Sequence, residues 1–282
     1  METIEKFNKL NSIKPSEPLA LIPTMGNLHE GHLSLIRRAK KLNLSTIVSI
    51  FINPLQFGPS EDFSKYPRTL ERDLDLLRKE QCDFVFIPDD KELLLDIKNL
   101  EAPLNDVLCG KSRPGHFDGV LTIVNRLIEV IKPDFCIFGQ KDFQQQLIIK
   151  EHLKKTNSTT QLIVHPIVRD KNGLALSSRN SFLSEPKKVK AAKIYFYLKE
   201  IAEQIFDFDR DDHKFLEHIK IIRDIYQTKY SEEGFEIDYL ELVNASSLES
   251  LKKEDKEILI AVAINYEGVR LIDNICLTRP VS

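Results

Sequence analysis

The stretch that decides the fold reads Leu19-Ala20-Leu21-Ile22-Pro23-Thr24-Met25-Gly26-Asn27-Leu28-His29-Glu30-Gly31-His32. Its apolar start is short and ends at Pro23, which is typical of a buried strand. In the residues that follow, Leu33, Ile36 and Ala39 recur at helical spacing. The stretch therefore predicts a strand, a tight turn and the beginning of a helix, with two histidines where that helix begins.

A helix N-terminus that carries histidines is suited to binding phosphate. Backbone N–H groups and a partial positive charge gather at such an end and favour anions. Gly26 and Gly31 bracket His29, and glycine lets the backbone approach a ligand closely. Two histidines three residues apart also occur as a metal pair or as plain surface residues. Because no cysteine or carboxylate lies nearby at zinc-site spacing, the context favours phosphate over metal.

The composition is that of an ordinary globular protein that handles small molecules. The 282 residues are 42% hydrophobic and 29% charged, enough for one large domain or two smaller ones. The formal net charge is −3, with no tail of one sign. A broad nucleic-acid surface usually shows as a basic excess, so the charge argues against RNA or DNA as the main partner.

Cysteine usage and hydropathy predict a cytoplasmic location. The four cysteines are scattered without a Cys-x-x-Cys pair, and the N-terminus lacks a signal-peptide core. We therefore expect reduced thiols and no disulfides. The longest apolar runs, such as 258–264, fall far short of the ~20 residues that a membrane helix needs, so no membrane contact is expected.

The first part of the chain alternates strand and helix patterns. Strand-like runs are expected at 19–23, 46–52, 83–88 and 135–139, helical patterns at 31–42, 68–80, 119–132 and 144–155, and a further apolar segment at 162–168. This alternation predicts an α/β fold with a doubly wound parallel sheet. Ligands of such sheets bind beyond the carboxyl ends of the strands. Polar residues follow four of the runs: His29 and His32, Asn53 and Gln56, Gln140 to Asp142, and Ser177 to Arg179.

The texture changes after Ser184-Glu185-Pro186. Helical patterns are expected at about 186–206 and 210–230, and strands at 237–243, 257–264 and 269–275. We predict a doubly wound domain over residues 1–182 and a smaller α+β domain over 183–282.

The motifs resemble those of a known family. Pro-Thr-Met-Gly-x-Leu-His-x-Gly-His, residues 23–32, resembles the signature of the pantothenate synthetases, which belong to the nucleotidyltransferase superfamily with the "HIGH" motif. Further segments that resemble this family follow in order along nearly the whole chain: 49–57, 66–69, 113–120, 138–145, 175–180 and 270–274. The resemblance implies a Rossmann-like N-terminal domain that binds ATP and pantoate, and a C-terminal domain that acts as a lid.

The resemblance also implies an activity. Such an enzyme is a ligase that forms a carbon–nitrogen bond, condensing pantoate with β-alanine to pantothenate at the expense of ATP. Pantoate first attacks the α-phosphate to give pantoyl adenylate and pyrophosphate, and β-alanine then displaces AMP. The implied partners are these small molecules and Mg²⁺, carried mainly by ATP so that no metal ligand of the chain is assigned. The implied assembly is a homodimer.

The family pattern assigns roles to individual residues. His32, His29 and Lys141 would be catalytic, with His32 as the proton donor. The ATP site would comprise Met25, Gly26, Asn27, Leu28, His29, Glu30, Gly31, His32, Gly139, Gln140, Lys141, Asp142, Val168, Leu176, Ser177, Ser178 and Arg179. Gln56 and Gln145 would bind pantoate, with Asn53 and Tyr66 as secondary pocket residues. Without the resemblance, Lys141 is equally explained as a surface lysine, and 176–180 as an ordinary turn.

Three positions depart from the family pattern, in which Glu is typical at Gln140, Lys at Arg126 and Tyr-Pro-x-Gly at 94–97. The last departure falls within the segment 90–105.

The alternative function is another HIGH-motif adenylyltransferase with a different small acceptor, which the Gln56 and Gln145 segments disfavour. A non-catalytic nucleotide-binding protein would tolerate loss of Lys141 or the histidines, and a tRNA synthetase fits poorly with so short and acidic a chain.

Overall fold

The computed structural model describes residues 1–59, 61, 63–207 and 214–278. Within these ranges the chain divides into two compact units. The first comprises the described residues of 1–106 and 113–168, and the second comprises Val107–Ser112 and the described residues of 169–278. The division after Val168 lies before the domain boundary expected at 182/183. The segment Val107–Ser112, which the sequence places in the first domain, belongs to the second unit.

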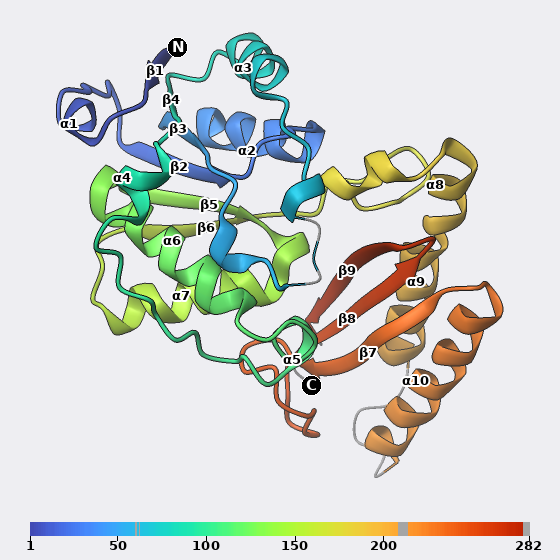
Figure 1. Cartoon of the computed structure of the whole chain (residues 1–282). Helices are drawn as coiled ribbons and strands as arrows, with labels where there is room; N and C mark the ends of the chain where they lie inside the picture. The colour runs from blue at the N-terminus through green and yellow to red at the C-terminus, as the bar shows by residue number, and fades with distance from the viewer. Residues whose placement is uncertain (60, 62, 208–213, 279–282) are drawn as a thin grey trace. The chain divides into compact units, whose positions relative to one another are not determined.

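The first unit is built on a six-stranded parallel sheet with the order β1-β4-β3-β2-β5-β6 (Figure 1). Its strands are β1 (Glu2–Ile4), β2 (Leu19–Thr24), β3 (Ser45–Ile50), β4 (Phe84–Phe86), β5 (Phe135–Gly139) and β6 (Gln161–His165). The doubly wound α/β fold is thus confirmed. The strand expected at 162–168 ends at His165, and Pro166, which has no N–H to donate, follows it directly. Strand β1 was not expected.

Helices cover both faces of this sheet. They are α1 (Phe7–Leu10), α2 (Glu30–Lys41), α3 (Leu70–Lys79), α4 (Asp90–Leu94), α6 (His116–Ile131) and α7 (Phe143–Lys155). Apolar residues of α2 and α3 form one core cluster with alternate residues of the strands, such as Ile22, Val48 and Ile137. Helices α6 and α7 pack on each other and against β2 and β5, on the other side of the sheet (Figure 1). The expected helices at 31–42, 68–80, 119–132 and 144–155 are therefore present.

The sheet order determines where ligand-binding residues gather. Strands β2 and β5 are neighbours in the sheet, although two other strands and their helices separate them in the sequence. From β2 the chain continues outward through β3 and β4, whereas β5 leads to the other edge. Residues that follow β2 and β5 therefore lie at the topological switch point, where doubly wound sheets bind their ligands.

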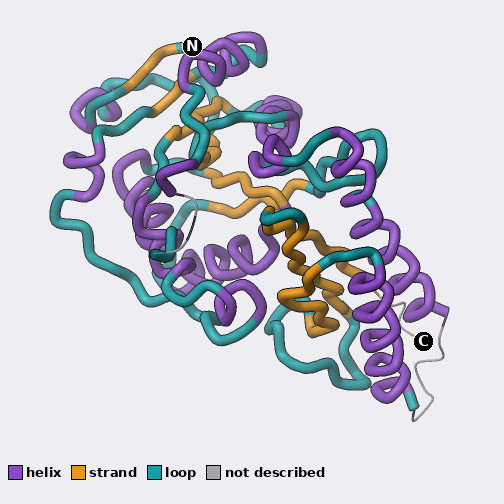
Figure 2. Tube along the Cα trace, turned by 45° about the vertical axis from the view of Figure 1, so that its right-hand side comes forward, coloured by secondary structure: helices purple, strands orange, loops and turns teal. Residues whose placement is uncertain are grey.

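The second unit is an α+β structure around a three-stranded antiparallel sheet, β7-β8-β9. Its strands are β7 (Glu236–Asn244), β8 (Glu257–Tyr266) and β9 (Val269–Thr278), and its helices are α5 (Leu108–Ser112), α8 (Glu185–Ala191), α9 (Lys193–Asp207) and α10 (Phe215–Glu232). The tube in Figure 2 shows α9 and α10 running beside each other. The helix expected at 186–206 is interrupted by a turn at Ala192, and the start of the one expected at 210–230 lies outside the described residues.

Candidate active site

The turn between β2 and α2 is organised by its two histidines. His29 is the N-cap residue of α2, and its Nδ1 accepts a hydrogen bond from the Gly31 N–H at 3.1 Å. The Nδ1 of His32 accepts a longer one, of 3.4 Å, from the His29 N–H. Because both Nδ1 atoms act as acceptors, these bonds assign the ring proton to Nε2 in each imidazole. Each histidine therefore presents an Nε2–H donor on the side of its ring away from the cap.

Both imidazoles are uncharged at neutral pH. Burial, together with the nearby Lys141 ammonium, lowers the pKa of His29 to about 4. Burial, followed by the neighbouring His29 and Lys141, lowers the pKa of His32 well below its usual value. The ring centroids are 4.1 Å apart, so two positive charges here would repel strongly. The pair supplies hydrogen-bond donors rather than cations.

The residues after β5 lie close to this pair. Gly139 ends β5, and Lys141 and Asp142 lie in the 3-10 turn that follows it. The charges of both Lys141 and Asp142 act on His29, and the Lys141 Nζ is 3.3 Å from an oxygen of Asp142. Two neutral donors and one ammonium thus converge at the switch point, in surroundings suited to phosphate.

The turn after β3 is fixed by Asn53. The Asn53 Oδ1 accepts from the Leu55 N–H at 3.0 Å, and its Nδ2 donates to the Gln56 Oε1 and to the Gly119 carbonyl, both at 3.0 Å. A Cβ at Gly119 would lie 2.1 Å from the Leu55 carbonyl oxygen. This helix position therefore admits only glycine, because α6 touches the backbone of the turn that carries Gln56.

A network of charged and polar groups, missed in the sequence, holds the same turn from another side. The Glu61 carboxylate accepts from the Arg113 Nε at 2.6 Å and from its Nη2 at 2.8 Å. Arg113 Nη1 lies 2.8 Å from His116 Nε2, and His116 Nδ1 lies 2.8 Å from the Gln56 carbonyl oxygen. Since Arg113 can only donate, His116 accepts at Nε2 and donates from Nδ1. Arg113 and His116 stand in a segment that resembles the family, but nothing in their spacing indicates Glu61 as the third member.

Electrostatics is consistent with this proton arrangement. Burial and the Arg113 charge lower the pKa of His116 to about 4. Burial alone would raise the pKa of Glu61, but the hydrogen bonds and charge of Arg113 outweigh it and lower that pKa to about 2. At neutral pH the network therefore consists of a carboxylate, a guanidinium and a neutral imidazole.

Sequence reasoning also missed two residues of α3 that contact residues 25–29, the turn between β2 and α2, which we call the histidine turn. Arg72 donates to the Asn27 side chain and the Leu28 carbonyl, and Asp73 accepts from the backbone of both residues. Asp73 is 1% exposed. The available signal was a carboxylate on the apolar face of the helix expected at 68–80, between Leu70 and Leu77.

The other expected site residues are distributed as follows. Gln145 lies half-buried in the first turn of α7, directly after the Lys141 turn, and Tyr66 is buried with its ring 5.9 Å from that of Phe57. Val168 is the last residue of the first unit. Leu176, Ser177, Ser178 and Arg179 belong to the second unit, where the Ser177 Oγ accepts from the Arg179 N–H at 3.3 Å. These assignments stay predictions.

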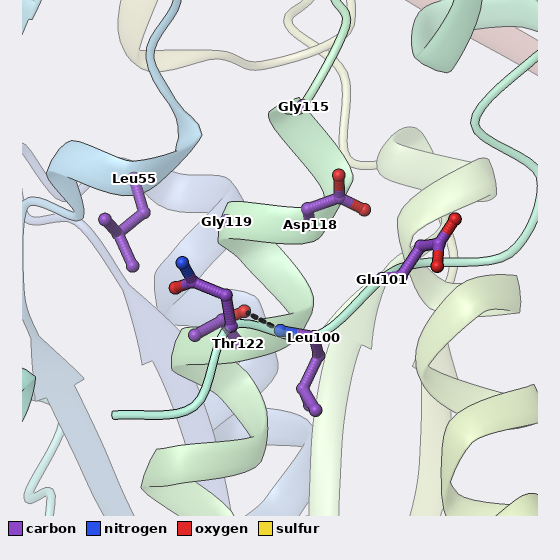
Figure 3. A pocket seen from close by; sticks show the side chains of 8 residues that line it. Leu55, Leu100, Glu101, Gly115, Asp118, Gly119 and Thr122 are labelled. Carbon is purple, nitrogen blue, oxygen red and sulfur yellow. Dashed lines mark hydrogen bonds between the residues drawn. The ribbon is translucent and has the colours of Figure 1, made fainter. Parts of the chain in front are cut away.

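The atypical segment within 90–105 is attached to α6. The Leu100 N–H donates to the Thr122 Oγ1 at 2.9 Å (Figure 3), and the Asp118 carboxylate accepts from the Ala102 N–H and the Asn105 side chain, both at 2.7 Å. An open pocket of about 340 Å³ lies between this segment, α6 and Leu55. Its charged lining groups, Asp118 and Glu101, are carboxylates, so this pocket is ill-suited to the phosphates of a nucleotide.

The described residues contain neither a metal-binding cluster nor a membrane-spanning helix. In the parts of the chain that the structure describes, no three or more His, Cys, Asp or Glu side chains are grouped to hold a metal ion. Within the same residues, no helix has both the length and the apolar character needed to cross a bilayer.

The parallel sheet and the paired histidines after its first central strand define an α/β protein of the HIGH-motif class. Comparisons with known proteins narrow this class. The chain belongs to the pantoate-beta-alanine ligase family, whose model matches residues 1–276. It is therefore an enzyme of the ligase class.

Relatives agree over the whole length of the chain. It is 44% identical to the pantothenate synthetase of Acetivibrio thermocellus and 42% identical to that of Caldicellulosiruptor saccharolyticus, covering 98% of this chain and 99% of each relative. The crystal structure of pantothenate synthetase from Thermus thermophilus matches with a TM-score of 0.84 at 35% identity, over 98% of this chain and 99% of that one. Pantoate-beta-alanine ligase from Francisella tularensis, complexed with β,γ ATP and β-alanine, matches with a TM-score of 0.73 at 34% identity, over 98% and 97%.

Proposed function

We propose that the chain condenses pantoate with β-alanine in two steps at the switch point of its parallel sheet, with ATP as the activating substrate. The observation that carries this proposal is the convergence of His29, His32 and Lys141 beyond β2 and β5. A related ligase has been crystallised with an ATP compound and β-alanine, which supports the same substrates here.

In the first step a carboxylate oxygen of pantoate attacks the α-phosphorus of ATP. The bond from this phosphorus to the bridging oxygen breaks, and pyrophosphate leaves with the electron pair. In the second step the β-alanine amine attacks the acyl carbon of pantoyl adenylate. The new C–N bond forms as the C–O bond to the phosphate breaks, so AMP leaves with one carboxylate oxygen and the amine releases a proton.

The residues contribute by charge and position. Both reactants of the first step are anions, so donors and cations must lie where negative charge develops. We assign this role to the Nε2–H groups of His29 and His32 and to the Lys141 ammonium. Because the His32 imidazole is neutral, it donates a hydrogen bond rather than a proton to the departing pyrophosphate. Mg²⁺ enters as part of the ATP complex. Gln56 and Gln145 bind pantoate, and Asn53 and Tyr66 shape that pocket.

The rest of the assignment follows the family pattern. The remaining ATP contacts would come from Met25 to Glu30, Gly31, Gly139, Gln140, Asp142, Val168 and Leu176 to Arg179. The C-terminal domain would act as a lid that protects the mixed anhydride from water.

We also propose a cytoplasmic homodimer, for which light scattering should give twice the mass of one chain. Light scattering that gives the mass of a single chain would contradict the dimer.

Oxygen labelling tests the intermediate. With pantoate labelled by ¹⁸O in its carboxylate, one labelled oxygen should appear in AMP, since the attacking oxygen leaves with the phosphate. If the label appeared in inorganic phosphate and ADP were formed, pantoate would have attacked the γ-phosphate. This result would contradict the adenylate intermediate. Omitting β-alanine is the control, and it should abolish the release of labelled AMP.

A further inference from the structure

Asp73 is a buried carboxylate that binds the backbone of the histidine turn. Its Oδ2 accepts from the Asn27 N–H and its Oδ1 from the Leu28 N–H, both at 2.8 Å. The Thr69 hydroxyl donates to Oδ2 at 3.1 Å. A carboxylate this deeply buried needs hydrogen-bond donors, and two of these three come from the turn itself.

The turn has a conformation that needs such support. Gly26 and Asn27 have φ angles of 77° and 49°, both in the left-handed region. Side chains other than glycine rarely adopt that region, although asparagine tolerates it better than most. A Cβ on Gly26 would lie 3.1 Å from the Asp73 Oδ2, so the carboxylate lies directly against the part of the turn that has the left-handed conformation.

Arg72 holds the outer side of the same turn. Its Nη1 donates to the Asn27 Oδ1 and its Nη2 to the Leu28 carbonyl, each at 3.3 Å. Two consecutive residues of α3 thus bind the turn in complementary ways. Asp73 accepts from the N–H groups of residues 27 and 28, and Arg72 donates to acceptor oxygens of the same two residues. One residue further along the chain is His29, the N-cap of α2.

We propose that Asp73 is a positioning residue of the active site, which holds the turn at residues 26–28 and thereby sets where the His29 and His32 rings stand. This inference rests on the proposed function, because it is the role of those rings that gives their placement a catalytic consequence. Asp73 itself does not touch substrate. Because the Asn27 and Leu28 N–H groups donate to Asp73, they do not serve as phosphate donors.

Hydrogen exchange of the wild-type protein tests the anchor directly. Without ligand, the Asn27 and Leu28 amides should exchange at least about a hundredfold more slowly than in an unstructured peptide. Adding Mg·ATP should slow them little further, because their hydrogen bonds already exist. Amides that exchange freely in the apo protein and become protected only with ATP would overturn the proposal.

Substitution tests the catalytic consequence. Asp73→Asn replaces one acceptor oxygen by an NH₂ group that faces a backbone N–H. We expect kcat of pantoate-dependent pyrophosphate exchange to fall about tenfold to a hundredfold, the scale of a small displacement of catalytic groups. The KM for pantoate should change less than about threefold, because Gln56 and Gln145 lie on other elements. A merely structural role would lower the melting temperature and leave kcat of the folded enzyme unchanged.

Asp75→Asn is the matched control. Asp75 lies on the same helix, is 67% exposed and pairs with Arg78, so this variant should keep wild-type kcat. A drop in kcat equal to that of Asp73→Asn would overturn the proposal. His32→Ala separates this inference from the proposed function. If His32→Ala lowers kcat and Asp73→Asn does not, only the positioning role of Asp73 is rejected. If His32→Ala keeps the wild-type kcat, the catalytic assignment of the histidines is rejected, together with the catalytic consequence that rests on it.

Discussion

The Nδ1 atoms of His29 and His32 both accept hydrogen bonds from backbone N–H groups at the start of α2. This arrangement decides which ring nitrogen of each histidine carries the proton. Histidine caps leave the Nδ1 atoms as acceptors and direct the Nε2–H donors elsewhere. Burial and Lys141 keep both rings neutral at pH 7. Lys141 therefore supplies positive charge in the proposed site, whereas the two histidines supply neutral hydrogen-bond donors.

Replacing one of these groups should reduce turnover without unfolding the protein. His32→Ala and Lys141→Ala should each lower kcat about a hundredfold or more, the scale seen when one preorganised donor is removed. Steady-state pantothenate formation measures the effect. His152→Ala is the control, since His152 binds Asn125 on the α6–α7 face and should leave kcat near wild type. Wild-type turnover in either test variant would remove that residue from the proposed chemistry.

The His116 network predicts how stability depends on pH. The pKa of His116 is about 4 in the folded chain and about 6.5 when unfolded, so between these values the unfolded state binds more protons. The free energy of unfolding should therefore fall as pH drops from about 6.5 to 4. Glu61, whose pKa is lowered to about 2 from 4.5, adds a further loss below pH 4.5.

Urea unfolding at several pH values checks this prediction. His116→Gln should show a shallower loss of stability between pH 6.5 and 4, and Glu61→Gln a shallower loss below pH 4.5. A His116→Gln variant with the full wild-type slope between pH 6.5 and 4 would contradict the assigned proton positions.

Among the elements of the first unit, α6 and the turn at Pro54–Gln56 approach each other so closely at Gly119 that no Cβ fits between them. Gly119→Ala would place its Cβ 2.1 Å from the Leu55 carbonyl oxygen, so the helix or the turn must move. We expect lower stability, by about 1–3 kcal/mol as for other overpacked sites, and a raised KM for pantoate through displaced Gln56.

Gly58→Ala is the matched control for this substitution. Among the described residues, its Cβ would meet the flexible Glu61 side chain, at 3.7 Å, and both stability and KM should stay close to wild type. The KM for each substrate and denaturant unfolding provide the measurements. A Gly119→Ala enzyme with unchanged KM for pantoate would contradict the placement of Gln56 in the pantoate pocket.

The elements could be predicted because their local signals are strong. The apolar runs at Leu19–Ile22 and Phe135–Phe138 and the helical period of 31–42 survive in the structure, since buried strands and amphipathic helices are patterns of near neighbours. The missed groups depend on distant pairs. Glu61 binds Arg113 and Asp73 binds Asn27 across about fifty intervening residues, and no local spacing indicates such partners.

At the scale of the whole molecule, each unit has a core of its own, and the second contains a buried ion pair. Arg169 donates to Asp273 at 2.5 and 2.8 Å, and its guanidinium lies 3.4 Å from the centroid of the Tyr195 ring. The Asp273 side chain is 3% exposed. This gives a physical reason for the segment 270–274, which the sequence shows only as a resemblance.

Breaking this pair should destabilise the protein strongly. Arg169→Met leaves the Asp273 carboxylate buried without its cation, at a cost of about 3–5 kcal/mol. Lys187→Met is the control, because the Lys187–Glu267 pair is more than 40% exposed on both sides and should contribute about 0–1 kcal/mol. Equal unfolding free energies of the two variants, measured in urea, would contradict the importance of the buried pair.

Exchange of labelled pyrophosphate into ATP tests the formation of pantoyl adenylate. It is measured with Mg²⁺ and pantoate, without β-alanine. We expect exchange that requires pantoate, followed by equal amounts of AMP and pantothenate once β-alanine is added. Absence of exchange, with no AMP formed on adding β-alanine, would contradict a pantoyl-adenylate mechanism at this site.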